Sequence, residues 1–195
     1  MLTMKKLLIF FALFASLTGC VPAALVAGAA GGAVGGAIVY DKRGIKTMVS
    51  DQNISQQASS KIYNDTELRT QAHIVVTSFN RIVLVVGQAP TAELRDRAIA
   101  LVQSVPNVRR VYNEITIEPP TSASQRAEDT WITTKAKSEM LARKGLQSTQ
   151  IKVLTENGVV YLMGVVTPSQ GDLAADVVRR VSGVQQVVKL FEYPS

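Results

Sequence analysis

The chain has 195 residues, of which 47% are hydrophobic and 18% charged, so it is long enough for one or two domains with apolar cores and is not of disordered or collagen-like composition. A single cysteine and a single histidine exclude an internal disulfide and a Cys/His metal cluster. The formal net charge of +6 favours anionic surfaces without choosing among them.

The N-terminus has the pattern of an export signal. Lys5 and Lys6 precede an apolar run, 7–17, that is too short to span a bilayer. The run ends in Leu17-Thr18-Gly19-Cys20, which resembles the bacterial lipobox. The resemblance implies that residues 1–19 are removed and that Cys20 carries a thioether-linked diacylglycerol and an N-acyl chain such as palmitate. The alternative is an ordinary signal peptide followed by a buried cysteine.

Lipidation at Cys20 has consequences for location and chemistry. Two or more acyl chains anchor a protein stably where one does not. Val21, rather than an aspartate, follows the cysteine. A residue other than aspartate at this position is similar to lipoproteins that are sorted to the outer membrane. The similarity implies that the protein lies at the outer membrane and faces the periplasm. Removal of Lys5 and Lys6 lowers the net charge from +6 to +4, and acylation leaves no thiol for catalysis or redox chemistry.

An Ala/Gly-rich segment follows the lipobox. Residues 21–40 are uncharged, and Gly28, Gly32 and Gly36 recur every four residues, as in small-residue helix-packing motifs. We expect residues 20–46 to be the lipidated cysteine with a flexible tether, because Gly-rich segments form helices poorly. The alternative is a helix that spans the membrane or lies on it.

The remainder of the chain is an internal repeat. Residues 74–87 align with 151–164 at a constant offset of 77. Before this block, three apolar residues spaced by four align at an offset of 78, namely Ile54, Ala58 and Ile62 with Ile132, Ala136 and Met140. After it, the offset is 76, as for Ala98 and Ala174. The chain therefore contains two copies of one unit.

Each copy is predicted to be α-β-β-α-β. The first helix has apolar residues at i, i+4 and i+8, and two β-rich runs, a second helix and a last strand follow it. Asn157-Gly158 between the runs of the second copy is a strong hairpin signal, and Asn80-Arg81 is a weaker one in the first. We assign the units to 47–118 and 128–195, with a Pro/Ser/Thr-rich linker at 119–127.

This order of elements resembles the BON domain (bacterial OsmY and nodulation). The densest matches are 129–135, 155–158, 161–164 and 180–184. With the lipobox and tether, the chain is similar to dual-BON outer-membrane lipoproteins. The resemblance implies an α+β fold of two tandem BON domains, each a small three-stranded mixed sheet with two helices. It also implies a non-enzymatic envelope protein that binds anionic phospholipid, accumulates at division sites and supports outer-membrane integrity.

Catalytic constellations are poor. His73 has no cysteine, acidic pair or Ser-x-x-Lys beside it in sequence, so a structural or surface role is expected. Acidic pairs near the start of the second helices, such as Glu93 with Asp96, are expected to interact favourably with the helix dipole. A role in glycoside hydrolysis is not expected for them. No phosphate-binding glycine motif follows a strand. We predict no enzyme, no cofactor and no metal.

The first helices of the two copies differ on their outer faces. On a helical wheel, the side opposite Ile132 carries Trp131, Thr134, Ser138, Leu141 and Ala142, flanked by Lys135, Lys137 and Lys144. The matching side of the first copy carries Asn53, Gln56, Ser60, Tyr63 and Asn64. The charge is +3 over 131–144 and zero over 53–66.

The apolar and basic face predicts a membrane contact. A tryptophan at headgroup depth and lysines near anionic lipid suit an interface. The family resemblance assigns lipid contact to this helix, which Trp131, Lys135 and Leu141 match. Position on the wheel adds Thr134, Lys137 and Ser138. The expected partners are phosphatidylglycerol and cardiolipin.

Two other readings of the face stay open. Trp131 could pack against the other unit or the linker, or it could be the hot spot of an adaptor for envelope proteins. The sequence has no evident acidic or aromatic sugar-binding groove, which disfavours peptidoglycan binding. The export signal disfavours nucleic acid.

Overall fold

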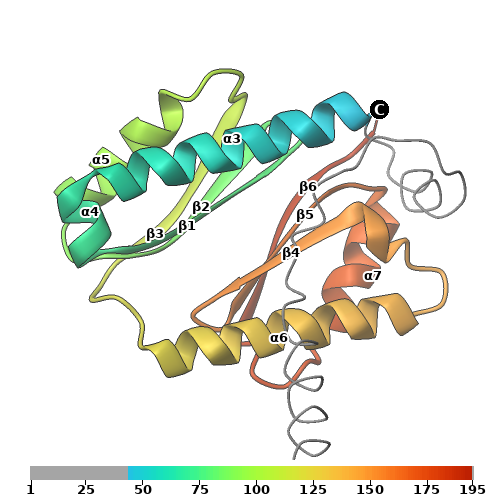
Figure 1. The fold of residues 1–195 in the computed structure, drawn as a ribbon. Coiled ribbons are helices and arrows are strands. Elements are labelled where there is room, and N and C mark those ends of the chain that lie inside the picture. Colours follow the sequence, from blue (N-terminus) through green and yellow to red (C-terminus); the bar gives the residue numbers. More distant parts are fainter. Residues whose placement is uncertain (1–43, 195) are drawn as a thin grey trace, which may run out of the picture. The chain divides into compact units, whose positions relative to one another are not determined.

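The computed structural model describes residues 44–194, so the export signal, Cys20 and most of the tether lie outside the described residues. Two copies of the predicted order follow each other along the chain (Figure 1). The elements of the first copy are α3 (Ile45–Asn64), α4 (Thr66–Gln71), β1 (His73–Phe79), β2 (Ile82–Ala89), α5 (Ala92–Gln103) and β3 (Arg110–Ile117). Those of the second are α6 (Ala123–Ala142), the 3-10 turn η1 (Ser148–Gln150), β4 (Ile151–Glu156), β5 (Val159–Val165), α7 (Pro168–Val178) and β6 (Gln186–Glu192).

Each copy contains a three-stranded mixed sheet, which confirms the α+β class. The middle strand, β2 or β5, pairs antiparallel with the strand before it and parallel with the strand after it. The parallel pair needs a crossover, which α5 and α7 provide. In Figure 1 the long helices α3 and α6 each run alongside the strands of their own sheet.

Three local features differ from the sequence expectation. Helix α3 begins at Ile45, inside the stretch 20–46 assigned to the lipidated cysteine and tether. Helix α6 begins at Ala123, inside the stretch 119–127 assigned to the linker, because the Ser122 hydroxyl accepts a hydrogen bond from the backbone N–H of Gln125 and caps the helix. The first copy also contains the unpredicted short helix α4. The Asp65 carboxylate caps α4, and Leu68 fills the core with 1% of its surface exposed.

Both hairpins turn through residues with positive φ. The central residues are Asn80 (52°) and Arg81 (62°) in the first copy, and Asn157 (48°) and Gly158 (75°) in the second. Positive φ at both positions matches the right-handed twist of the strands. An arginine adopts this conformation reluctantly, so the first turn needs further support.

A buried aspartate from the first helix supplies that support in each copy. The Asp51 carboxylate accepts hydrogen bonds from the backbone N–H groups of Asn80 (2.8 Å) and Arg81 (2.7 Å) and from the Ser78 hydroxyl (2.8 Å). The Asp129 carboxylate accepts from the N–H groups of Asn157 (2.8 Å) and Gly158 (2.9 Å). Each first helix is thereby fastened to the hairpin turn of its own sheet.

Each sheet is apolar on both faces. In β2, Val83 and Val85 face the core beneath α3 and α5, whereas Leu84 and Val86 belong to a separate buried cluster. Alternation along a strand produces the two faces. In the second copy, Val160 and Leu162 belong to the core beneath α6 and α7, and Tyr161 and Met163 to the separate cluster.

That separate cluster joins the two copies, which lie in one compact unit. Polar contacts border it. The Lys152 ammonium donates to the Ser78 carbonyl (3.0 Å), and the Gln88 amide donates to the Glu156 carboxylate (2.9 Å). His73 Nε2 lies 3.6 Å from Glu156 Oε2. Two polar side chains also approach Glu192, namely Asn80 and Arg109.

We predict that Asp129→Ala destabilises the protein by about 2–3 kcal/mol, because two backbone N–H groups lose a charged acceptor. Asp129→Asn keeps one acceptor oxygen and should cost less. Urea unfolding followed by circular dichroism measures both. Equal stability of wild type and Asp129→Ala would contradict the fastening role.

A second prediction concerns alkaline pH. Burial raises the pKa of Tyr161 to about 12, and the nearby carboxylates of Glu114 and Glu156 add to the shift. The folded protein therefore holds the phenolic proton more tightly than the unfolded chain does. Its contribution to stability is complete below pH about 10 and is lost at up to about 1.4 kcal/mol per pH unit as the pH rises towards 12.

Free energies of unfolding measured from about pH 9 to about pH 12 test this prediction. Tyr161→Phe should lose less stability over that range than wild type, because phenylalanine has no proton to release. Parallel curves for the two proteins would show that Tyr161 is not the group responsible.

Candidate functional site

Helix α6 has a buried side and an exposed side. Ile132, Ala136 and Met140 are almost completely buried in the core of the second copy. Trp131 exposes 53% of its surface and Leu141 73%. More than half of the Trp131 surface therefore stays open to solvent, which argues against burial of the indole against the first copy or the linker.

The structure places all six predicted contact residues on exposed surface, namely Trp131, Thr134, Lys135, Lys137, Ser138 and Leu141. The two hydroxyls donate back to helix carbonyls, Thr134 to Thr130 (2.9 Å) and Ser138 to Thr134 (3.0 Å), so they are satisfied without a ligand. Lys135 forms an ion pair with Glu139 at 3.2 Å. We call these six residues the docking face.

The first copy is less different than the sequence comparison suggests. Tyr63, which corresponds to Leu141, exposes 64% of its surface, and Ile45 and Val49 are exposed in the first turns of α3. Ile45 and Val49 lie before the range 53–66, over which the two first helices are compared in sequence. The Arg69 guanidinium of α4 lies over the Tyr63 ring at 5.3 Å from its centroid, which is a cation–π contact.

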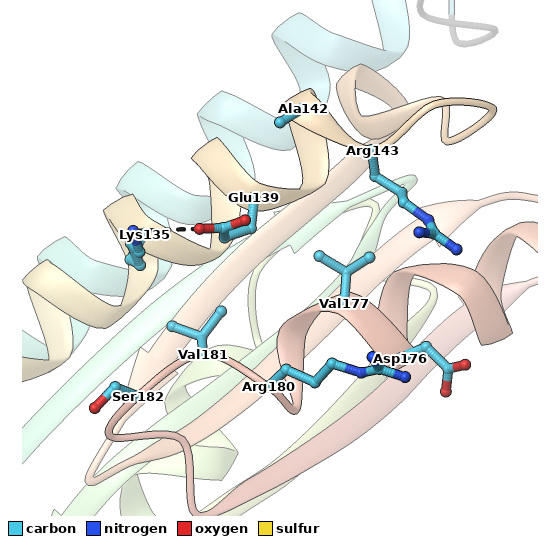
Figure 2. Close-up of a pocket in the computed structure, with 9 residues that line it drawn as sticks. All are labelled: Lys135, Glu139, Ala142, Arg143, Asp176, Val177, Arg180, Val181 and Ser182. Atoms are coloured by element: carbon cyan, nitrogen blue, oxygen red, sulfur yellow. Dashed lines mark ion pairs between the residues drawn. The ribbon is translucent and has the colours of Figure 1, made fainter.

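Sequence reasoning missed a groove between α6 and α7 of about 550 Å³ (Figure 2). Its walls carry Lys135 and Arg143 from the α6 side and Arg180 from just beyond α7. Residues 143 and 180 are far apart in sequence, and no local pattern connects them. On the wheel Arg143 falls near the core side of α6, which was the only available signal that it faces α7.

His73, for which a structural or surface role is expected, lies close to a carboxylate of the second copy. His73 is half-buried beside Glu156, with Gln88 on the same carboxylate. Among residues 44–194 no group of three or more His, Cys, Asp or Glu side chains is placed to hold a metal ion. No helix in this range is long and apolar enough to cross a membrane. The predicted lipidation of Cys20 and the two readings of residues 21–40 lie outside it.

Comparison with known proteins identifies the architecture. The BON domain family matches residues 50–119 and 128–195. The outer membrane lipoprotein DolP of Haemophilus influenzae is 36% identical over 97% of this chain and 96% of its own length. This chain belongs to the dual-BON DolP family. The family relationship supports an outer-membrane BON-domain lipoprotein.

Two other relatives align with less of the chain. The 21 kDa hemolysin of Actinobacillus pleuropneumoniae is 38% identical over 78% of this chain and 79% of its own. The osmotically-inducible protein Y of Escherichia coli is 24% identical over 73% of this chain and 72% of its own. None of these three relatives has the name of an enzyme.

Substitutions at neighbouring positions on the two sides of α6 should change the free energy of unfolding by very different amounts. Trp131→Ala should change the free energy of unfolding by less than about 0.5 kcal/mol, as is usual on a surface. Ile132→Ala should cost about 2–5 kcal/mol, because it leaves a cavity in the core. Circular dichroism in urea measures both changes. Tryptophan fluorescence cannot, because Trp131→Ala removes the chain's single tryptophan. A large loss for Trp131→Ala would mean that the indole contributes to the core.

Proposed function

We propose that the protein is a lipid-anchored envelope protein whose second BON domain docks on membranes containing anionic phospholipid. The observation that carries the proposal is the exposure of Trp131 and Leu141 on a helix face flanked by lysines. Phosphatidylglycerol and cardiolipin are the proposed lipids. The site performs binding and not catalysis.

The chemistry of the docking face suits a membrane interface. An indole ring has an apolar body and a polar N–H, which favour headgroup depth. Leu141 adds apolar area that gains free energy on leaving water. Lys135 and Lys137 flank this area, and each cation near an anionic surface contributes about 1 kcal/mol. The attraction is therefore weak, reversible and sensitive to salt.

A weak site becomes effective when a tether holds it near its target. If Cys20 is acylated, the acyl chains keep the protein at the outer membrane and raise the effective concentration of the docking face there. Docking then selects membrane patches by lipid composition. Enrichment at division sites and support of outer-membrane integrity are the proposed cellular consequences.

A second candidate function is a protein adaptor in envelope assembly or cell-wall hydrolase regulation. An exposed tryptophan beside a leucine is also typical of a protein hot spot. Binding of a defined protein partner, abolished by Trp131→Ala and unchanged by lipid, would favour this function over membrane docking.

Vesicle binding tests the proposal. The fragment 21–195 retains every residue of the three buried clusters and lacks the predicted signal and acylated cysteine. We expect it to bind phosphatidylglycerol vesicles more tightly than phosphatidylcholine vesicles, with a blue shift of Trp131 emission. Trp131→Glu or Leu141→Glu should each weaken binding by about tenfold or more, because a large apolar side chain no longer enters the interface.

Tyr63→Glu is the matched control, because Tyr63 occupies the position of Leu141 in the first copy and is similarly exposed. It should change vesicle binding by less than about twofold if docking uses α6 alone. Equal binding to neutral and anionic vesicles, or unaltered binding of Trp131→Glu, would reject the docking face.

A further inference from the structure

The groove between α6 and α7 contains two guanidinium groups without an acidic partner. Within residues 44–194 neither Arg143 nor Arg180 forms an ion pair. The two acidic residues in the lining are already paired, Glu139 with Lys135 and Asp176 with Arg179. The groove therefore offers positive charge that the protein does not neutralise itself.

Arg143 and Arg180 both line this groove. Figure 2 shows Val177 and Val181 pointing towards α6 from the α7 side, while Arg143 reaches from the end of α6 towards α7. The valines make an apolar floor beneath charged walls. A volume of about 550 Å³ lies within the range of small-ligand sites.

The first copy has no arginine at the two corresponding positions. Asp65 corresponds to Arg143 and caps α4. Ser104 corresponds to Arg180, and its hydroxyl donates to the Leu101 carbonyl at 2.7 Å. The first copy, which differs at this point by the added helix α4, has an acid and a neutral residue at the two positions, so the arginine pair is specific to the second copy.

We propose that this groove binds the phosphate of an anionic phospholipid headgroup, an inference that rests on the membrane docking proposed above. Arg143 and Arg180 hold the phosphate oxygens from opposite walls, because planar guanidinium groups match phosphate geometry. The glycerol carbons lie over Val177 and Val181. The groove is lined by the C-terminal parts of both helices, whose partial negative charge repels anions, so the guanidinium groups must supply the attraction.

A membrane lipid is the favoured source of the phosphate because the groove adjoins the docking face. Lys135 belongs to both, and Ala142 lines the groove directly after Leu141. Insertion of Trp131 and Leu141 into the interface therefore brings the groove to headgroup depth. The two parts have different tasks: the docking face supplies apolar anchoring, and the groove selects phosphate.

Charge-matched variants of fragment 21–195 test the groove. A diffuse attraction predicts that loss of any one exposed cation weakens binding to phosphatidylglycerol vesicles about fivefold. Lys144→Gln is the control, since Lys144 lies beside Arg143 but does not line the groove. We expect about fivefold for this control and about tenfold to a hundredfold for Arg143→Gln and Arg180→Gln. Arg180→Lys, which keeps the charge without the planar fork, should fall between wild type and Arg180→Gln.

The outcomes separate the groove from the docking face. Equal losses for Arg180→Gln and Lys144→Gln, with Trp131→Glu still impaired, would overturn the groove and leave the docking face standing. Absence of wild-type binding to anionic vesicles would overturn both. Titration with inorganic phosphate separates the sources: saturation by phosphate that depends on Arg180, without any dependence of vesicle binding on Arg180, would overturn the lipid assignment. Circular dichroism of each variant excludes unfolding as the cause.

Discussion

The rotational setting of helix α6 depends on one buried carboxylate. Asp129 is 4% exposed and accepts two backbone hydrogen bonds from the hairpin turn, so its side of the helix must face the sheet. Ile132, one turn later, follows it into the core. Trp131 lies two residues after Asp129 and is thereby directed away from the core. The same contact that closes the hairpin therefore determines which side chains α6 presents to the solvent.

The pairing of the two copies has a different physical origin. A sheet whose middle strand is apolar on both faces cannot leave either face in water without a large cost. Helices cover one face of each sheet, and the cluster containing Leu84, Val86, Tyr161 and Met163 covers the other. Each copy thus completes the burial of its neighbour. The outer faces of α3 and α6 take no part in this burial, which frees them to differ.

Periodic features of the sequence predicted most of the fold, and contacts between distant residues account for what it could not predict. Apolar spacing and the Asn157-Gly158 turn located the helices and the hairpins, because both signals are local. The alignment at an offset of 78 also pairs Asp51 with Asp129, yet nothing local indicates that they bind turns 28 or more residues away. Helix α4 is too short to show a period. For the candidate site, the wheel predicted the exposure of the docking face, but the pairing of Arg143 with Arg180 requires the packing of two helices.

Exposed Trp131 and Leu141 contribute less to folding than core side chains, because 53% of the Trp131 surface and 73% of the Leu141 surface stay in contact with water in the folded chain. The free energy of burying this remaining surface becomes available only when another surface covers it. If that surface is a membrane, a few cations and two apolar side chains amount to a few kcal/mol, which is less than acyl chains provide. The proposed docking face therefore adds little to the anchor itself. Its effect is to bias where an already anchored protein resides, and a groove selective for phosphate would make that bias depend on lipid chemistry and not on charge alone.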